Sequence, residues 1–101
     1  MPEHFNALSP AEAERLAFLI EECGEVIQAA SKILRHGYDS FNPTLDADVS
    51  NRDRLTIELG QVRAAMYLLH TSGDINEHRE KVATLTKIRS VRHGMHHQPE
   101  T

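Results

Sequence analysis

Apolar residues recur at alternating intervals of four and three along one unbroken stretch, and this spacing limits the possible folds more than any other feature. They are Leu16, Ile20, Cys23, Ile27, Ala30 and Leu34. Such spacing places side chains on one side of an α-helix, as a seam for packing against other helices. A Ser-Pro-Ala-Glu sequence at residues 9–12 predicts a helix start with a capping box, and Gly37 predicts the stop. We therefore expect a helix over about residues 10–36, with Gly24 as a candidate interruption.

Two further helices are expected. The second runs from residues 50–53 to residues 72–73, with a seam formed by Leu55, Leu59, Val62, Met66 and Leu69. The third begins with Asp74 or Asn76 as its cap and runs to about His93, with Val82, Leu85, Ile88 and Val91 facing inward. No segment alternates with period two for long enough to predict a sheet. The fold class is therefore all-α, a single domain over residues 1–101 with an ordered core of about residues 9–94.

Composition excludes several classes of function. Lys and Arg number 11 and Asp and Glu number 15, a net charge of −4 that argues against nucleic-acid binding. The longest apolar stretch has four residues (17–20), whereas a membrane span needs about 20. The first residues lack the basic and apolar segments of a signal peptide, and the one cysteine, Cys23, is expected to be a small core residue. We therefore expect a cytoplasmic protein with no membrane or nucleic-acid partner.

Only 5% of the residues are aromatic, and so small a chain buries little surface alone. We expect an oligomer, at least a dimer, with a four-helix core built from the first two helices of each subunit.

Several glutamates interrupt the apolar side of the expected helices. Projected at about 100° per residue, Glu22 falls in an apolar sector and Glu25 lies at its edge. Glu58 projects almost into the second seam, with Gln61 beside it. An isolated buried carboxylate costs several kcal/mol, so these groups need a partner, either a cation such as Arg54 or a divalent metal ion. We favour the metal, because oxygen ligands without His or Cys suit Mg²⁺.

The sequence Glu21-Glu22-Cys23-Gly24-Glu25, followed after a helix and loop by Glu58-Leu59-Gly60-Gln61, resembles the MazG-like family over about residues 12–72. The family pattern is EExxE, a spacer, then ExxD. Residues 32–37 are similar to the corresponding stretch of phage-encoded members. One departure is clear, since Gln61 stands where the family has Asp. The departure leaves three alternatives open: a weakened second Mg²⁺ position, a contact from Gln61 to the substrate, or an inactive relative.

The resemblance implies an all-α nucleoside triphosphate pyrophosphohydrolase that uses Mg²⁺, or Mn²⁺ in its place. Such enzymes split an NTP or dNTP between the α and β phosphates and form homodimers or homotetramers. It implies Glu22, Glu25, Glu58 and Gln61 as metal ligands, and Glu21 or Glu22 as the group that orients or deprotonates water. Similarity to the phage MazZ-like branch makes dGTP or GTP the first-choice substrate, and places a phage-encoded protein in the host cytoplasm.

Cationic groups are expected to hold the rest of the triphosphate, and the loop of residues 37–51 to hold the base. The expected substrate-binding residues are Lys32, His36, Tyr38, Asn51 and Arg54. Phe41 and Ser40 are further candidates for contact with the base. The connection between the first two helices, residues 37–49, is long for a pair of helices. It is either a plain surface loop or a lid over a site between the helices.

Two other functions fit the sequence. One is a non-catalytic helical dimerisation module, whose glutamates form salt bridges between helices. The other is a related all-α hydrolase acting on dUTP, dCTP or phosphoribosyl-ATP. The histidines at 93, 96 and 97 are expected to belong to a solvated C-terminal segment and not to a transition-metal site.

Overall fold

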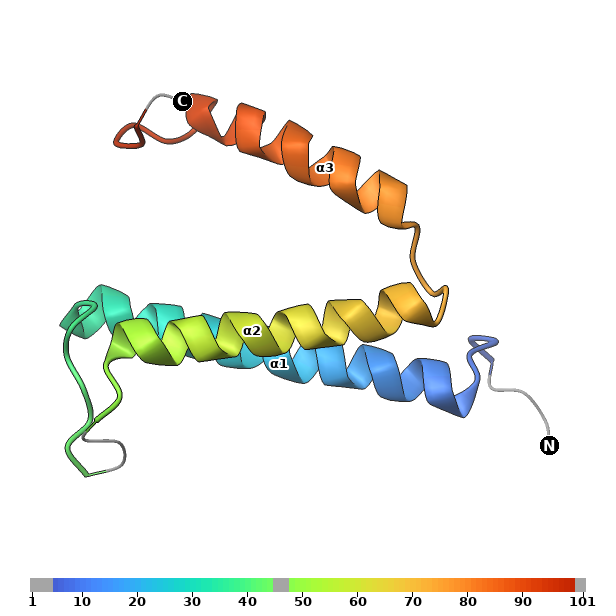
Figure 1. The fold of residues 1–101 in the computed structure, drawn as a ribbon, viewed down its shortest axis with the longest axis horizontal. Helices are drawn as coiled ribbons and strands as arrows, with labels where there is room; N and C mark the ends of the chain where they lie inside the picture. Colours follow the sequence, from blue (N-terminus) through green and yellow to red (C-terminus); the bar gives the residue numbers. More distant parts are fainter. Residues whose placement is uncertain (1–4, 45–47, 100–101) are drawn as a thin grey trace.

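The computed structural model describes residues 5–44 and 48–99 and is built from helices (Figure 1). Helix α1 spans Pro10–His36, α2 spans Asn51–Thr71 and α3 spans Glu77–Ser90, followed by a single 3₁₀ turn at Val91–His93. Within the described ranges the extended pairing is limited to one isolated bridge between Phe41 and Ser50. The all-α prediction is confirmed, and α1 is continuous through Gly24. None of the described helices is long and apolar enough to cross a membrane.

The helix ends are set by local hydrogen bonds that the sequence predicts. Ser9 Oγ accepts from the Glu12 amide at 3.1 Å, and Glu12 Oε1 accepts from the Ser9 amide at 2.8 Å, which completes the capping box of α1. Gly37 ends α1 with a φ of +88°, a conformation that favours glycine. Asn76, the second of the two cap candidates, caps α3 by accepting from the Arg79 amide at 2.9 Å.

Helices α1 and α2 form an antiparallel hairpin and pack along each other (Figure 1). The fully buried apolar residues of this interface are Ala29 on α1 and Ala65 and Leu69 on α2. Two alanines at the contact let the helix axes approach closely. Glu22 and Glu58 are buried in the same structure, so the hairpin brings carboxylates as well as apolar groups into its interior.

The expected seam of α1 does not face α2 within one chain, and the expectation that Cys23 is a core residue is wrong there. Ile20, Ile27 and Leu34 are 72%, 65% and 89% exposed, and Cys23 is exposed instead of lying in a core. The contact uses the face that carries Glu22 and Ala29. Helix α1 is apolar on two faces, and periodicity alone does not say which of them meets the neighbouring helix.

The seam of α2 is only partly buried, and α3 stands apart from the hairpin (Figure 1). Leu69 is buried but Leu59 is 46% exposed. The α3 residues expected to face inward, Val82, Leu85 and Ile88, are about half exposed, so that prediction is also wrong within one chain. The turn between α2 and α3 directs the chain away from the hairpin, so no helix among the described residues packs over the apolar side of α3.

An ion pair fixes the position of that turn. Arg15 near the start of α1 donates to both carboxylate oxygens of Asp74, at 2.6 Å and 3.1 Å, and both side chains are mostly buried. A bidentate arginine–carboxylate pair is strongly directional. It holds the chain after α2 against the first turns of α1, which explains why Asp74 is not the cap of α3.

Candidate functional site

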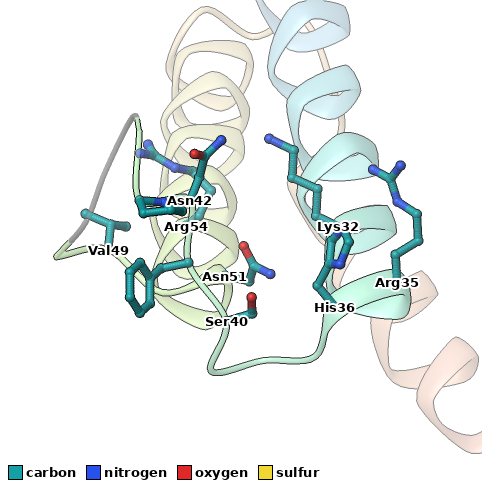
Figure 2. Close-up of a pocket in the computed structure, with 10 residues that line it drawn as sticks. Lys32, Arg35, His36, Ser40, Asn42, Val49, Asn51 and Arg54 are labelled. Atoms are coloured by element: carbon teal, nitrogen blue, oxygen red, sulfur yellow. The ribbon is translucent and has the colours of Figure 1, made fainter.

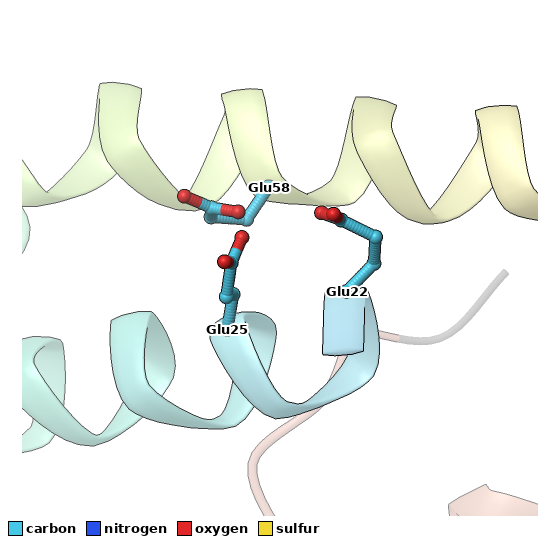
Figure 3. Close-up of side chains that lie close together, drawn as sticks. All are labelled: Glu22, Glu25 and Glu58. Atoms are coloured by element: carbon cyan, nitrogen blue, oxygen red, sulfur yellow. The ribbon is translucent and has the colours of Figure 1, made fainter. Parts of the chain in front are cut away.

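Three carboxylates converge near the middle of the hairpin (Figure 3). Glu22 and Glu25 project from α1 toward Glu58 on α2, and one oxygen from each lies within 4.8 Å of the others. Glu22 and Glu58 are each 8% exposed, and Glu25 is half-buried. The helical projection is confirmed, because all three lie where α1 and α2 meet. We call Glu22, Glu25 and Glu58 the carboxylate cluster.

The surroundings of the cluster disfavour its charged form. Burial raises the pKa of Glu22 first, and the neighbouring carboxylates of Glu25 and Glu21 raise it further. Burial also raises the pKa of Glu58, followed by its contact with Glu25. Arg54 lowers the pKa of Glu58, but this is the smallest of the effects on that group. The pKa of Glu58 is raised despite Arg54, and a bound divalent cation would favour the charged form of the cluster.

The donor set indicates what kind of cation fits. The cluster offers carboxylate oxygens only, without His or Cys, and hard divalent ions such as Mg²⁺ and Mn²⁺ prefer such ligands. The cluster can therefore bind a metal ion. Glu21, expected to act on water, is exposed on α1 and lies outside the three converging residues.

Gln61 lies beside the cluster, one turn after Glu58 on α2. With its amide oriented by its hydrogen-bond partners, its nitrogen donates to Glu22 Oε2 at 3.0 Å and to Glu58 Oε2 at 2.8 Å. The sequence placed Gln61 in the site as an oxygen ligand. The structure brings it to the site, but with its donor group facing the carboxylates.

A cavity of about 310 Å³ lies between the end of α1, the following loop and the start of α2, with lining residues one to two helical turns from the cluster (Figure 2). Lys32 and His36 project from α1 on one side, and Asn51 and Arg54 belong to α2 on the other. These four residues were predicted to bind substrate, and the structure brings them together around one space. Among the described residues, those that line the cavity are Lys32, Arg35, His36, Ser40, Phe41, Asn42, Pro43, Val49, Asn51 and Arg54.

Tyr38, also predicted to bind substrate, is placed elsewhere. Its ring stacks on the Arg52 guanidinium, 4.4 Å from ring centroid to Cζ, and it is not among the residues that line the cavity. Arg52 also donates to Asp39 Oδ1 at 3.4 Å. Tyr38 therefore helps to hold the loop against α2. No feature of the sequence indicates this pair, because it depends on how the loop folds back.

Sequence reasoning missed Arg35, Asn42, Pro43 and Val49. Arg35 carried a usable signal, since it follows Lys32 by three residues and shares a helix side with it. The other three lie in the loop, where no periodic pattern indicates direction. Their positions depend on contacts between segments that are distant in sequence.

Backbone hydrogen bonds tie both ends of the loop together. The Asn51 amide donates to the Ser40 carbonyl at 2.7 Å, and the Arg52 amide donates to the Tyr38 carbonyl at 2.8 Å. Asn51 Nδ2 also donates to the Gly37 carbonyl at 3.1 Å. These bonds fix residues 37–41 against the start of α2, so the described part of the loop forms a wall of the cavity.

Comparison of the chain with protein families, with curated proteins and with solved structures finds no match.

Proposed function

We propose that the chain is a divalent-metal-dependent nucleoside triphosphate pyrophosphohydrolase. The observation that carries this proposal is that the carboxylate cluster and the cation-lined cavity lie next to each other on one hairpin. Arg54 in the cavity wall precedes Glu58 by one turn, a rise of about 6 Å along α2. Lys32 follows Glu25 by two turns of α1, a rise of about 10 Å. A metal site beside a group of cations suits a substrate with several phosphates.

Each part of the site has a role in the proposed reaction. Glu22, Glu25 and Glu58 would hold Mg²⁺, which when bound neutralises charge that develops on phosphate oxygens. Lys32, His36 and Arg54 bind the remaining phosphate oxygens, and Arg35 adds a fourth basic group. Water is added across the bond between the α and β phosphates, giving a nucleoside monophosphate and pyrophosphate. A carboxylate, either Glu21 or Glu22, orients the water and accepts its proton.

The loop side of the cavity suits a nucleobase. Phe41, Pro43 and Val49 supply apolar surface, and Ser40 and Asn51 supply polar groups. Because Asn51 Nδ2 is held by the Gly37 carbonyl, its side-chain oxygen is oriented as an acceptor for an N–H group of a base. We propose dGTP or GTP as the first-choice substrate, from the resemblance to phage enzymes. Guanine carries an acceptor and donors on one edge, which a polar pocket can distinguish.

We further propose that the protein is a homodimer or homotetramer with a four-helix core. The support is the stripe of exposed apolar residues on α1, formed by Ile20, Ile27 and Leu34, together with the exposed apolar side of α3. Large exposed apolar patches mark interaction sites in most proteins.

The same stripe favours a second candidate, a non-catalytic helical dimerisation module. The two candidates differ in what they predict for metal ions. A metal-binding cluster should raise the melting temperature when Mg²⁺ or Mn²⁺ is added, because the ion binds only the folded state. A module without a metal site should melt at the same temperature with and without the ion.

The decisive experiment is a panel of NTPs and dNTPs with Mg²⁺ or Mn²⁺ and detection of pyrophosphate. The panel includes dUTP, dCTP and phosphoribosyl-ATP, which cover the related activities. Glu14→Gln is a matched control for Glu58→Gln, because Glu14 is exposed on α1 and outside the cluster. Pyrophosphate release by the wild type and by Glu14→Gln, lost in Glu58→Gln, supports the proposal. No release from any nucleotide by the wild type refutes it.

A further inference from the structure

The neutral side chain of Gln61 contacts two members of the carboxylate cluster, Glu22 and Glu58. A primary amide carries two N–H donors, so one can go to each carboxylate. The two acceptors, Glu22 and Glu58, belong to different helices. The amide therefore forms a bridge from α1 to α2 through a pair of charge-assisted hydrogen bonds.

The bridge opposes a repulsion that the cluster creates. Two buried carboxylates on facing helices push α1 and α2 apart when both are ionised. Donors placed between them reduce that repulsion and hold one oxygen of each at a fixed position. One oxygen each of Glu22, Glu25 and Glu58 lies within 4.8 Å of the others, so the carboxylates held in this way are already grouped.

We propose that Gln61 is a positioning residue that holds the carboxylates of Glu22 and Glu58 together across the two helices in the metal-free protein. This inference rests on the proposed function, since it assigns the carboxylates to a metal site. An aspartate at this position would lack both donors and would add a fourth negative charge. The glutamine thus gives a site with less charge that is already assembled when it is empty.

The test compares Gln61→Met with Gln28→Met. Methionine has a similar length and a good helix propensity but neither donates nor accepts strongly, and Gln28 is exposed on α1. In buffer with a metal chelator, Gln61→Met should lower the melting temperature by about 4–8 °C. This is the shift expected when the net contribution of one ordinary hydrogen bond is lost from a domain of this size, because Gln61 is itself exposed to solvent and its two bonds are partly replaced by water. Gln28→Met should melt close to the wild type. Equal melting temperatures for all three proteins would overturn the proposal.

Two measurements separate positioning from general support of the fold. Titration calorimetry should show that Gln61→Met weakens Mg²⁺ binding about 10- to 100-fold, as removal of groups that orient metal ligands does elsewhere. The ¹⁵N resonance of the Gln61 side-chain amide should shift when Mg²⁺ is added to the wild type. A Gln61→Met protein with weakened Mg²⁺ binding but the wild-type melting temperature in chelator would make Gln61 an oxygen ligand and overturn the proposal.

Gln61→Glu gives an independent check. It keeps the side-chain length, removes both donors and adds a charge, so it should melt below Gln61→Met in chelator and gain more from Mg²⁺ than the wild type does. A Gln61→Glu protein as stable as the wild type in chelator would contradict the inference. The melting comparison in chelator needs neither metal nor substrate. Failure of the pyrophosphohydrolase proposal would appear instead as absence of Mg²⁺ binding or of pyrophosphate release by the wild type.

Discussion

Replacing Ile27 with glutamate tests whether the exposed stripe of α1 is buried between two copies of the chain. Ile27 lies in the middle of the stripe and is 65% exposed in one chain. Complete burial of an isoleucine stabilises by about 1.5–3 kcal/mol, so covering this exposed fraction is worth about 1–2 kcal/mol in each subunit. A symmetric dimer contains the residue twice, which gives about 2–4 kcal/mol. The dissociation constant should therefore rise by about 30- to 700-fold.

The true effect should exceed this range, because the variant also places an unpaired carboxylate in an apolar contact. Gln28→Glu is the matched control, since it adds the same charge at the neighbouring exposed position outside the stripe. Sedimentation velocity over a concentration series measures the dissociation constant of each protein, and circular dichroism checks that both remain helical. A wild-type protein that is monomeric at micromolar concentration would refute the reasoning. So would an Ile27→Glu protein that associates as tightly as Gln28→Glu.

Three further outcomes are expected. Glu22→Gln, Glu25→Gln and Glu58→Gln should each lower kcat/KM for the best nucleotide by more than about a hundredfold with unchanged helical content, measured by pyrophosphate release and circular dichroism. The pKa values of Glu22 and Glu58 are raised in the folded state, so the metal-free protein should lose stability as pH rises from about 4.5 through the raised values. Thermal melts in chelator across that pH range should show the fall, and Glu58→Gln should flatten it. In steady-state assays dGTP should have a higher kcat/KM than dATP, dCTP or dTTP, and equal values would remove the guanine preference.

The parts of the fold that depend on neighbouring residues could be predicted from the sequence. The capping box at Ser9 and the stop at Gly37 are local, and the bounds of α1 follow from them. The convergence of Glu22 with Glu58 was also accessible, because a charged residue on the apolar side of each of two helices indicates that the helices meet there. Helical geometry makes such a projection dependable over a few turns.

The parts that depend on distant contacts could not be predicted. Helix α1 has two apolar faces, and only the packing with α2 selects the one around Ala29. Tyr38 was assigned to the substrate because aromatic rings often stack on bases, but its position is set by Arg52, fourteen residues later. The orientation of the Gln61 amide depends on carboxylates from both helices, so no reading of α2 alone could have found it.

The hairpin buries few apolar side chains beside its buried carboxylates. Its fully buried apolar residues within the described ranges are two alanines and a leucine, yet it also buries Glu22 and Glu58. A ligand that binds only the folded state adds about 2.7 kcal/mol when present at a hundred times its dissociation constant. In the proposed assembly, Mg²⁺ and the second subunit both bind the folded hairpin and not the unfolded chain. Binding of either one therefore increases the fraction of chains that are folded and able to bind the other. Conditions that remove the metal should also weaken the dimer.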